Sequence, residues 1–134
     1  MLKRILVLDD SQDILDIVKE TLSYEKFEVK TTSSSDHIID TLQTYRPDLV
    51  ILDYKQTGPK GDDICRDIKA HPNLQNTPVI ICSAYLANND LSQCGCDATI
   101  AKPFGLNELL DKVKTLVYRS MVPRMRTWAH IETF

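Results

Sequence analysis

The chain has 134 residues, of which 43% are hydrophobic and 26% are charged, and its formal net charge at pH 7 is −3. This length and composition predict one globular domain with a single core, and they argue against a disordered chain. The slightly acidic charge argues against direct binding of nucleic acid, which normally requires a basic surface.

Five short apolar segments have the length of β-strands, at residues 4–10, 27–33, 48–53, 78–84 and 98–104. Within them, residues 50–52 and 79–82 are apolar without interruption rather than alternating with polar residues. Uninterrupted apolar runs are typical of parallel strands that are covered on both faces.

Segments with helical periodicity lie between these strands. The apolar stripes are Ile14, Leu15, Val18 and Leu22; Ile38, Ile39, Leu42 and Tyr45; Ile64 and Ile68; and Leu106, Leu109, Leu110, Val113 and Val117. Residues 85–96 have only Leu86 and Leu91 as apolar anchors, so a helix there is weakly specified. Strands that alternate with helices predict right-handed βαβ units, and therefore a twisted parallel sheet with helices on both faces.

The sequence lacks the expected features of membrane-spanning or secreted proteins. No apolar stretch approaches the roughly 20 residues of a membrane-spanning helix. The first apolar run meets Asp9 and Asp10 after four residues, which is too short for a signal peptide. We therefore expect a cytoplasmic protein that does not bind membranes.

The pattern fades after residue 119, so we assign residues 1–119 to one domain and residues 120–134 to a C-terminal tail. Pro123 interrupts any helix in this tail, and a disordered stub is the first interpretation. Because Trp128 and several methionines and arginines lie in it, a segment that docks on a partner or forms a homodimer is the alternative.

The cysteines at positions 65, 82, 94 and 96 fit a reducing compartment in which thiols stay reduced. The Cys94–Cys96 pair can in principle hold a soft metal ion. However, the sequence has no second pair at metal-finger spacing, which argues against a metal site. Cys82 lies in an apolar segment and is interpreted as core.

Polar side chains stand at the ends of four of the five predicted strands. In an open parallel sheet, ligands bind outside the carboxyl ends of the strands. The side chains that this rule brings together are Asp9 and Asp10, Asp53, Ser83 and Lys102. The sequence therefore predicts one small cleft with three carboxylates, a hydroxyl and an ammonium.

Three neighbouring carboxylates repel one another unless a cation compensates them. Mg²⁺ suits carboxylates, waters and a phosphate oxygen. An incoming phosphoryl group would meet the metal, the Lys102 ammonium and the Ser83 hydroxyl. A carboxylate that attacks phosphorus gives an acyl phosphate, and Asp53 is the predicted nucleophile.

The chain resembles the receiver domain of two-component response regulators along residues 3 to about 119. The matching pieces are "LDD" at 8–10, "VILD" at 50–53, "ICSA" at 81–84 and "IAKPF" at 100–104. The resemblance implies a CheY-like, flavodoxin-like (βα)₅ fold, α/β with strand order 2-1-3-4-5. It also implies phosphorylation of Asp53 by a histidine kinase or a histidine phosphotransfer protein, and signalling through contacts with an unknown downstream protein.

The same resemblance implies roles for individual residues. Asp10, Asp53 and the backbone carbonyl of Lys55 would bind Mg²⁺ directly, and Asp9 through water. Ser83 and Lys102 would contact the phosphoryl group. The peptide bond before Pro103 is expected to be cis.

The chain departs from the family at several positions. Receivers usually carry an aromatic residue at position 99 as a switch, and here the residue is Thr99. Tyr85 and Lys55 occupy positions that tune phosphoryl lifetime in this family. In the loop after Asp53, only Gly61 is retained from the usual pattern, which is expected to alter the rigidity of the loop rather than its chemistry.

Two other functions are compatible with parts of the sequence. A docking module that works without phosphorylation would fit Thr99 and the unusual loop, but it need not retain the five site residues. A Mg²⁺-dependent phosphohydrolase would normally carry a second aspartate where this chain has Lys55. We therefore expect a signalling switch whose only chemistry is phosphorylation and dephosphorylation at Asp53, rather than an enzyme.

Overall fold

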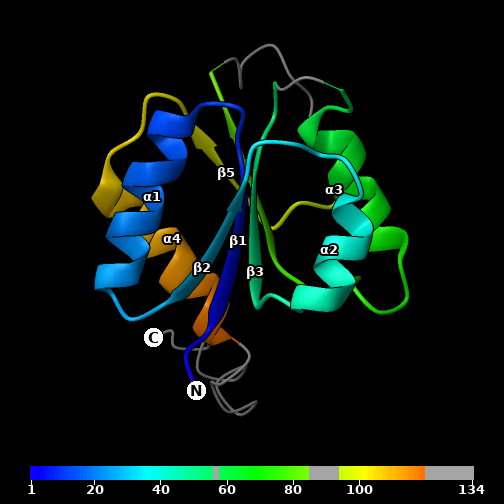
Figure 1. The fold of residues 1–134 in the computed structure, drawn as a ribbon, viewed down its shortest axis with the longest axis horizontal. Coiled ribbons are helices and arrows are strands. Elements are labelled where there is room, and N and C mark those ends of the chain that lie inside the picture. Colours follow the sequence, from blue (N-terminus) through cyan, green and yellow to red (C-terminus); the bar gives the residue numbers. More distant parts are fainter. Residues whose placement is uncertain (56–57, 85–93, 120–134) are drawn as a thin grey trace, which may run out of the picture.

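The computed structural model describes residues 1–55, 58–84 and 94–119 (Figure 1). In chain order, the elements are β1 (Arg4–Leu8), α1 (Gln12–Tyr24), β2 (Glu28–Thr32), α2 (Ile38–Tyr45), β3 (Leu49–Asp53), α3 (Gly61–Ala70), β4 (Val79–Ser83), β5 (Ala98–Ala101) and α4 (Leu106–Tyr118). All five predicted strands are confirmed, and each is shorter than the apolar segment that predicted it.

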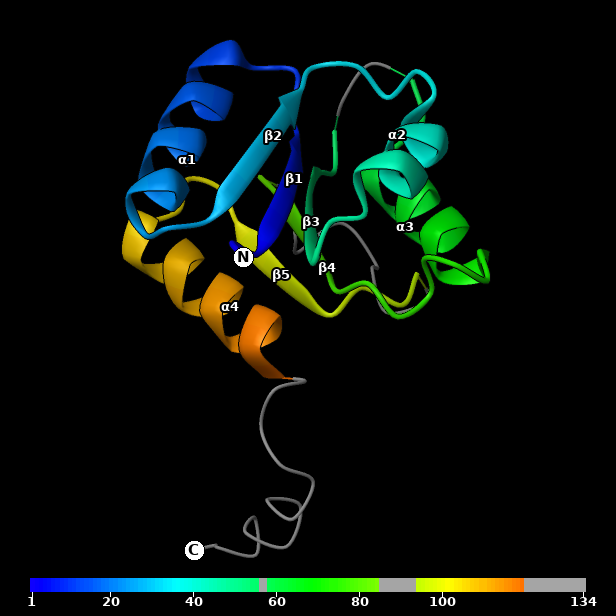
Figure 2. The same ribbon diagram turned by 60° about the horizontal axis from the view of Figure 1, so that its bottom comes forward.

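The strands form one parallel sheet in the order β2-β1-β3-β4-β5. Every residue of β3 and β4 is buried, as expected for strands covered on both faces, whereas β2 and β5 lie at the edges and are partly exposed. Figures 1 and 2 show α1 and α4 on one face of the sheet and α2 and α3 on the other. The expected flavodoxin-like α/β fold is therefore confirmed.

The sheet separates two hydrophobic clusters. The cluster on the α1–α4 side includes Ile5, Leu15, Leu22, Ile80, Cys82, Ile100 and Val113. The cluster on the α2–α3 side includes Leu6, Leu42, Leu52, Ile64, Cys65, Ile68, Ile81 and Cys94. Alternate residues of each buried strand point to opposite clusters, which is why these strands are apolar at every position.

The helix ends follow local chemistry that the sequence only partly indicates. Ser11 is the N-cap of α1, and its hydroxyl accepts a hydrogen bond from the Ile14 N–H at 3.4 Å. In α4, Glu108 lies in the first turn, where a helix dipole favours an acidic residue. Before α2, His37 adopts a left-handed conformation with φ of 57°, which the apolar stripe does not predict.

Three expectations lie wholly or largely outside the described residues: the weak helix expected in residues 85–96, the role of Tyr85, and the character of the tail from 120 to 134. Among the residues that the structure does describe, no helix is long and apolar enough to cross a membrane.

The two-sided packing of the sheet predicts different costs for two isoleucines. Ile5 lies in the first cluster with none of its surface exposed, whereas Ile17 on α1 is 49% exposed. We expect Ile5→Ala to lower the free energy of unfolding by about 2–5 kcal/mol, because it leaves a cavity. Ile17→Ala should change it by only about 0.5 kcal/mol. Urea unfolding of both variants measures this, and equal losses would contradict the packing described.

Candidate functional site

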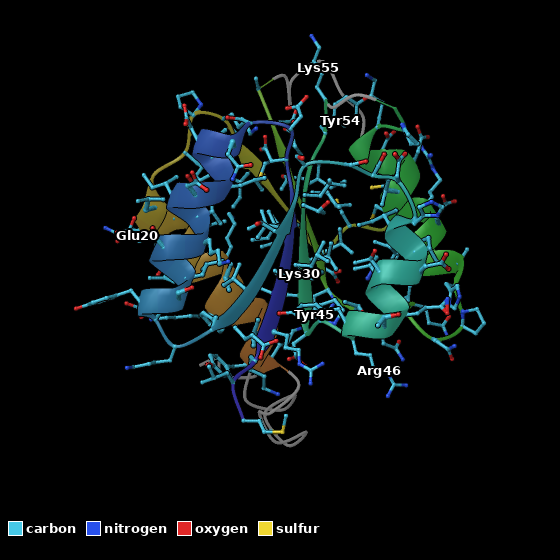
Figure 3. All side chains as sticks on the ribbon, in the orientation of Figure 1. Glu20, Lys30, Tyr45, Arg46, Tyr54 and Lys55 are labelled. Atoms are coloured by element: carbon cyan, nitrogen blue, oxygen red, sulfur yellow. The ribbon has the colours of Figure 1, made fainter. Side chains whose placement is uncertain are left out.

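The parallel register brings the carboxyl ends of four strands to one edge of the sheet. Leu8 pairs with Leu52, Cys82 pairs with Asp53, and Ser83 pairs with Ala101. The residues that end or directly follow these strands therefore lie side by side. Figure 3 shows Tyr54 and Lys55, which follow β3, at this edge, and Tyr45 near the opposite one.

The ammonium of Lys102 joins two of the predicted carboxylates. Its Nζ lies 2.9 Å from Asp9 Oδ2 and 2.9 Å from Asp53 Oδ1. The carboxylate side chains are only 5% and 7% exposed, and the lysine side chain is 18% exposed. Because β4 lies between β3 and β5, the lysine that follows β5 spans the end of β4 to reach Asp53.

Backbone groups fix the orientation of this ion pair. The N–H of Ser11 donates to Asp9 Oδ1 at 2.9 Å, which leaves Oδ2 for the lysine. The N–H of Lys102 donates to the carbonyl of Ser83 at 2.9 Å, so the residue after β5 stays in register with β4. The Lys102–Pro103 peptide bond is cis, as expected.

The pKa of Asp53 is raised above its ordinary value, although the carboxylate is paired with a lysine. Burial is the main cause, and the charges of Asp9 and Asp10 act in the same direction. The hydrogen bond from Lys102 opposes them without reversing the shift. Burial also lowers the pKa of the Lys102 ammonium, but its hydrogen bonds to Asp9 and Asp53 outweigh this effect and raise the pKa. The site thus contains more negative charge than one lysine balances.

The donor set fits a hard divalent cation. One carboxylate oxygen from each of Asp9, Asp10 and Asp53 lies within 4.8 Å of the other two, and Asp10 is exposed while the other two are buried. Three negative charges and one positive charge leave two negative charges, which a divalent ion neutralises. Oxygen ligands of this kind are those that Mg²⁺ prefers. The Asp cluster is therefore suited to Mg²⁺.

Gly61, the first residue of α3, lies directly against the backbone of the candidate nucleophile. Its N–H donates to the carbonyl of Tyr54 at 2.9 Å. A Cβ on Gly61 would lie 2.9 Å from the Asp53 carbonyl oxygen and 2.9 Å from Tyr54 Cα. Contacts this short force the backbone to shift. The sequence singles out Gly61 only as the residue of this loop that keeps the family pattern, and it does not predict the close approach of Gly61 to the backbone of Asp53.

The remaining predicted residues lie at different distances from this cluster. Ser83 is 2% exposed and ends β4 beside the lysine, as predicted. Lys55 is exposed two residues after Asp53. Thr99 is half-buried on β5 and pairs in register with Ile81 on β4. Strand β4 therefore separates it from Asp53, and Asp9 and Asp10 lie one strand further away. Tyr85 lies outside the described residues.

Comparison with known proteins identifies the class. The family model of the response regulator receiver domain matches residues 5–114. The chain therefore belongs to the receiver domain family of response regulators, which act as phosphorylation-dependent switches in two-component signalling.

Among curated proteins, the chain is 31% identical over 123 residues to the phosphate regulon transcriptional regulatory protein PhoB of Rhizobium meliloti, covering 90% of this chain and 54% of that protein. It is 32% identical over 122 residues to the nisin biosynthesis regulatory protein NisR of Lactococcus lactis, covering 89% of this chain and 52% of that protein. The chain thus spans about half the length of the curated relatives that it matches.

Among solved structures, the chain is similar to the response regulator protein TrrA of Thermotoga maritima in complex with Mg²⁺ and BeF. The TM-score is 0.77 and the identity 33%, over 86% of this chain and 99% of that one. A CheY-like receiver domain protein of Methanospirillum hungatei gives a TM-score of 0.79 at 30% identity, over 89% of this chain and 96% of that one.

The close approach of Gly61 predicts a strong effect of one added methyl group. Gly61→Ala should weaken Mg²⁺-dependent binding of beryllofluoride at least tenfold, because the Asp53–Tyr54 backbone must move. Gly105→Ala is the matched control, since a Cβ there meets nothing within 4 Å. Isothermal titration measures both affinities, and equal affinities for the two variants would contradict the positioning role.

The raised pKa of Asp53 predicts that this carboxylate destabilises the metal-free fold. The folded state holds the Asp53 proton more tightly than the unfolded state, so stability falls as pH rises from the ordinary aspartate pKa through the raised one. At pH 7 without Mg²⁺, we therefore expect Asp53→Asn to unfold at a higher temperature than the parent. Lys102 keeps its contact with Asp9 in this variant.

Thermal melts followed by circular dichroism test this expectation. The increase in unfolding temperature of Asp53→Asn over the parent should become smaller toward pH 4, where the parent carboxylate takes up its proton. A variant that melts at a lower temperature than the parent at pH 7 would show that the Asp53 carboxylate stabilises the fold instead.

Proposed function

We propose that Asp53 accepts a phosphoryl group from the phosphohistidine of a histidine kinase or a histidine phosphotransfer protein. The observation that carries this proposal is the Lys102 ammonium, 2.9 Å from both Asp9 and Asp53 within a cluster of three carboxylates. The half-buried Lys102 ammonium could receive a second anion at this point once Asp53 no longer carries a free carboxylate.

In the proposed reaction, a carboxylate oxygen of Asp53 bonds to phosphorus while the P–N bond of the phosphohistidine breaks. The side chain then no longer offers a free carboxylate to Lys102. The ammonium keeps Asp9 as a partner and turns its second contact toward a phosphoryl oxygen. Ser83, which ends the adjacent strand, would contact the same group through its hydroxyl in this proposal.

Asp9, Asp10, Asp53 and the backbone carbonyl of Lys55 would hold Mg²⁺ in this proposal. When bound, the ion neutralises the negative charge of the carboxylates and of the transferring phosphoryl oxygens. The exposed position of Asp10 leaves one side of the cluster open to solvent, from which both the ion and the phosphodonor can enter.

The output is proposed to be a change in protein–protein contacts rather than turnover of a substrate. Formation of the acyl phosphate replaces the Lys102–Asp53 pair, which joins β5 to β3. That replacement gives the phosphorylated and free proteins different contacts at one end of the sheet, which a partner can distinguish. The bond is lost again by hydrolysis at the same residue, so the only chemistry proposed is self-phosphorylation and self-dephosphorylation.

The proposal predicts one modification at a known place. With Mg²⁺ and acetyl phosphate, the protein should gain a single phosphoryl group that is acid-labile and sensitive to hydroxylamine, as acyl phosphates are. Asp53→Asn should abolish it, and chelation of Mg²⁺ should slow it strongly. Asp16→Asn, on the exposed face of α1, is the control and should be phosphorylated like the parent.

Intact mass spectrometry and peptide mapping follow the reaction. Phosphorylation that persists at the parental rate in Asp53→Asn would overturn the assignment. Binding of the metal without phosphorylation would instead favour a docking module that works without the modification.

A further inference from the structure

An apolar groove lies between α1 and the segment that leads into α4, beside the aspartate site. It has a volume of about 430 Å³, and its walls include Ile14 and Ile17 on one side and Phe104 and Leu106 on the other. Lys102, whose ammonium contacts two of the site carboxylates, also lines it. The Ile17 side of the groove is open, since that residue is 49% exposed. Concave and largely apolar surfaces of this size are typical of binding sites.

Exposed aromatic side chains continue from this groove toward the C-terminal ends of the two helices. Tyr24 lies two turns beyond Ile17 on the same face of α1 and is 82% exposed. Tyr118, at the end of α4, has its ring 6.2 Å from that of Phe27, which follows α1. The C-terminal ends of the two helices are therefore neighbours, and Figures 1 and 2 show α1 and α4 side by side. A chain that leaves α4 can run back along these helices to the groove.

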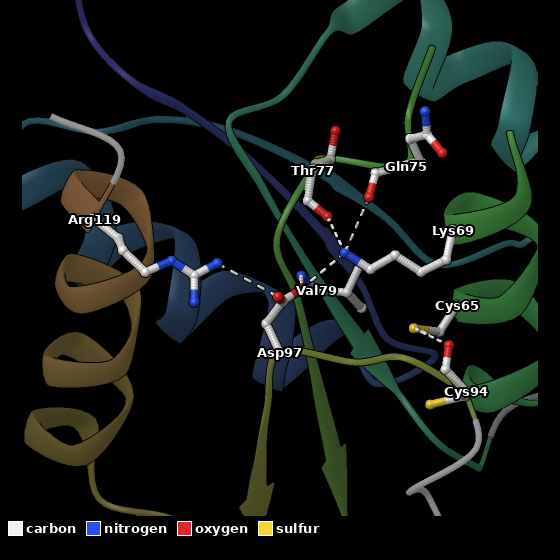
Figure 4. Close-up of polar contacts among 8 residues, drawn as sticks. All are labelled: Cys65, Lys69, Gln75, Thr77, Val79, Cys94, Asp97 and Arg119. Atoms are coloured by element: carbon white, nitrogen blue, oxygen red, sulfur yellow. Dashed lines mark hydrogen bonds and ion pairs between the residues drawn. The ribbon is translucent and has the colours of Figure 1, made fainter. Parts of the chain in front are cut away.

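An ion pair places the start of the C-terminal segment. Arg119, the last described residue, has its Nη2 3.5 Å from Asp97 Oδ1 (Figure 4). Asp97 is itself bound by the Lys69 ammonium at 2.9 Å and by the Val79 N–H at 2.8 Å. The segment therefore begins at a point that α3, β4 and the start of β5 hold together.

The chain after this point is long enough to reach the groove. Helix α4 has 13 residues and is about 20 Å long, at about 1.5 Å per residue. The groove lies at the N-terminal end of this helix, where Leu106 lines it. The stretch from Arg119 to Trp128 spans about 30 Å when it is extended. Trp128 can thus return past the whole helix with length to spare for crossing between the helices.

The α1 side of the groove is acidic. Asp13 and Glu20 lie about one turn on either side of Ile17, and both are exposed. Neither has an ion pair with another described residue. Figure 3 shows the Glu20 side chain on the outer side of α1. The Lys114 ammonium, on the neighbouring helix, is already paired with Glu25 at 2.9 Å. The complement of this surface is a segment that is both apolar and basic.

We propose that residues 120–134 of the same chain occupy this groove, with Trp128 as the side chain that fills it. The segment is apolar and basic, because Arg124 and Arg126 lie among two methionines, a valine and the tryptophan. Tryptophan and arginine are the residues that most often dominate the energy of an interface. An indole ring buries a large apolar area, and its N–H can still reach a polar rim.

The spacing of the segment sets which charges meet. With Trp128 beside Ile17, an extended chain places Arg126 about 7 Å back along α1. One turn of the helix is about 5.4 Å, so Arg126 then meets Glu20. Because Lys102 lines the same groove, the docked indole covers the aspartate site from the α1 side.

The chain has one tryptophan, so its fluorescence reports on this docking directly. Indole emission shifts to shorter wavelength in apolar surroundings, and acrylamide quenches a covered indole less. For the full chain, we expect emission at shorter wavelength and a quenching constant at least threefold lower than in urea-unfolded protein. Ile17→Asp should remove both differences, and Glu20→Lys should at least double the quenching constant. Asp67→Lys reverses an exposed acid on α3, on the other face of the sheet, and is the matched control with no change.

Dilution separates the two possible occupants of the groove. Docking within one chain does not depend on protein concentration, whereas occupation by a second copy weakens on dilution and would overturn the proposal. Circular dichroism checks that each variant is folded, and Glu20→Lys keeps the test valid if an aspartate in the groove disturbs α1. Emission at the wavelength of the unfolded protein, full protection in either folded variant, or an equal loss of protection in Asp67→Lys would also overturn it.

Discussion

The Lys102 ammonium lies between two carboxylates that are almost fully buried, and the arrangement of the whole site depends on it. A lone buried carboxylate is costly, and three close together repel one another. The lysine offsets part of this cost for Asp9 and Asp53 and leaves a net charge of minus two for a divalent cation to balance. The folded site thus keeps a net negative charge that its own residues do not balance. The proposed binding of a divalent cation and a phosphoryl group would relieve this imbalance of charge.

The order of the strands explains how one lysine can contact both Asp9 and Asp53. Because β4 separates β3 from β5, the ion pair joins an edge strand to the centre of the sheet across the end of β4. Gly61 completes the arrangement from the other side, since the absence of a Cβ lets α3 begin against the backbone of Asp53. Asp53 is therefore linked to the residue after an edge strand through a charged contact, and to α3 through backbone packing.

The sequence predicted the sheet well because buried parallel strands leave a strong signal, as the unbroken apolar runs of β3 and β4 show. It also predicted that the side chains of Asp9, Asp53 and Lys102 would meet, since these residues end or directly follow their strands. It could not predict contacts that depend on backbone distances, such as Gly61 against Tyr54. Nor could it place Cys65 beside Cys94, because spacing along the chain says nothing about which helix packs beside a distant turn.

The division of the interior into two hydrophobic clusters has a consequence for how such a module diversifies. The clusters share no buried residue, and the backbone of the sheet lies between them. Substitutions that reshape one outer surface can then accumulate without repacking the other, provided that the strand ends keep their positions. Two solved structures near 30% identity share this fold, as such freedom allows. Each face of the domain can therefore change its surface residues, and with them its binding partners, while the residues at the carboxyl ends of the strands stay the same.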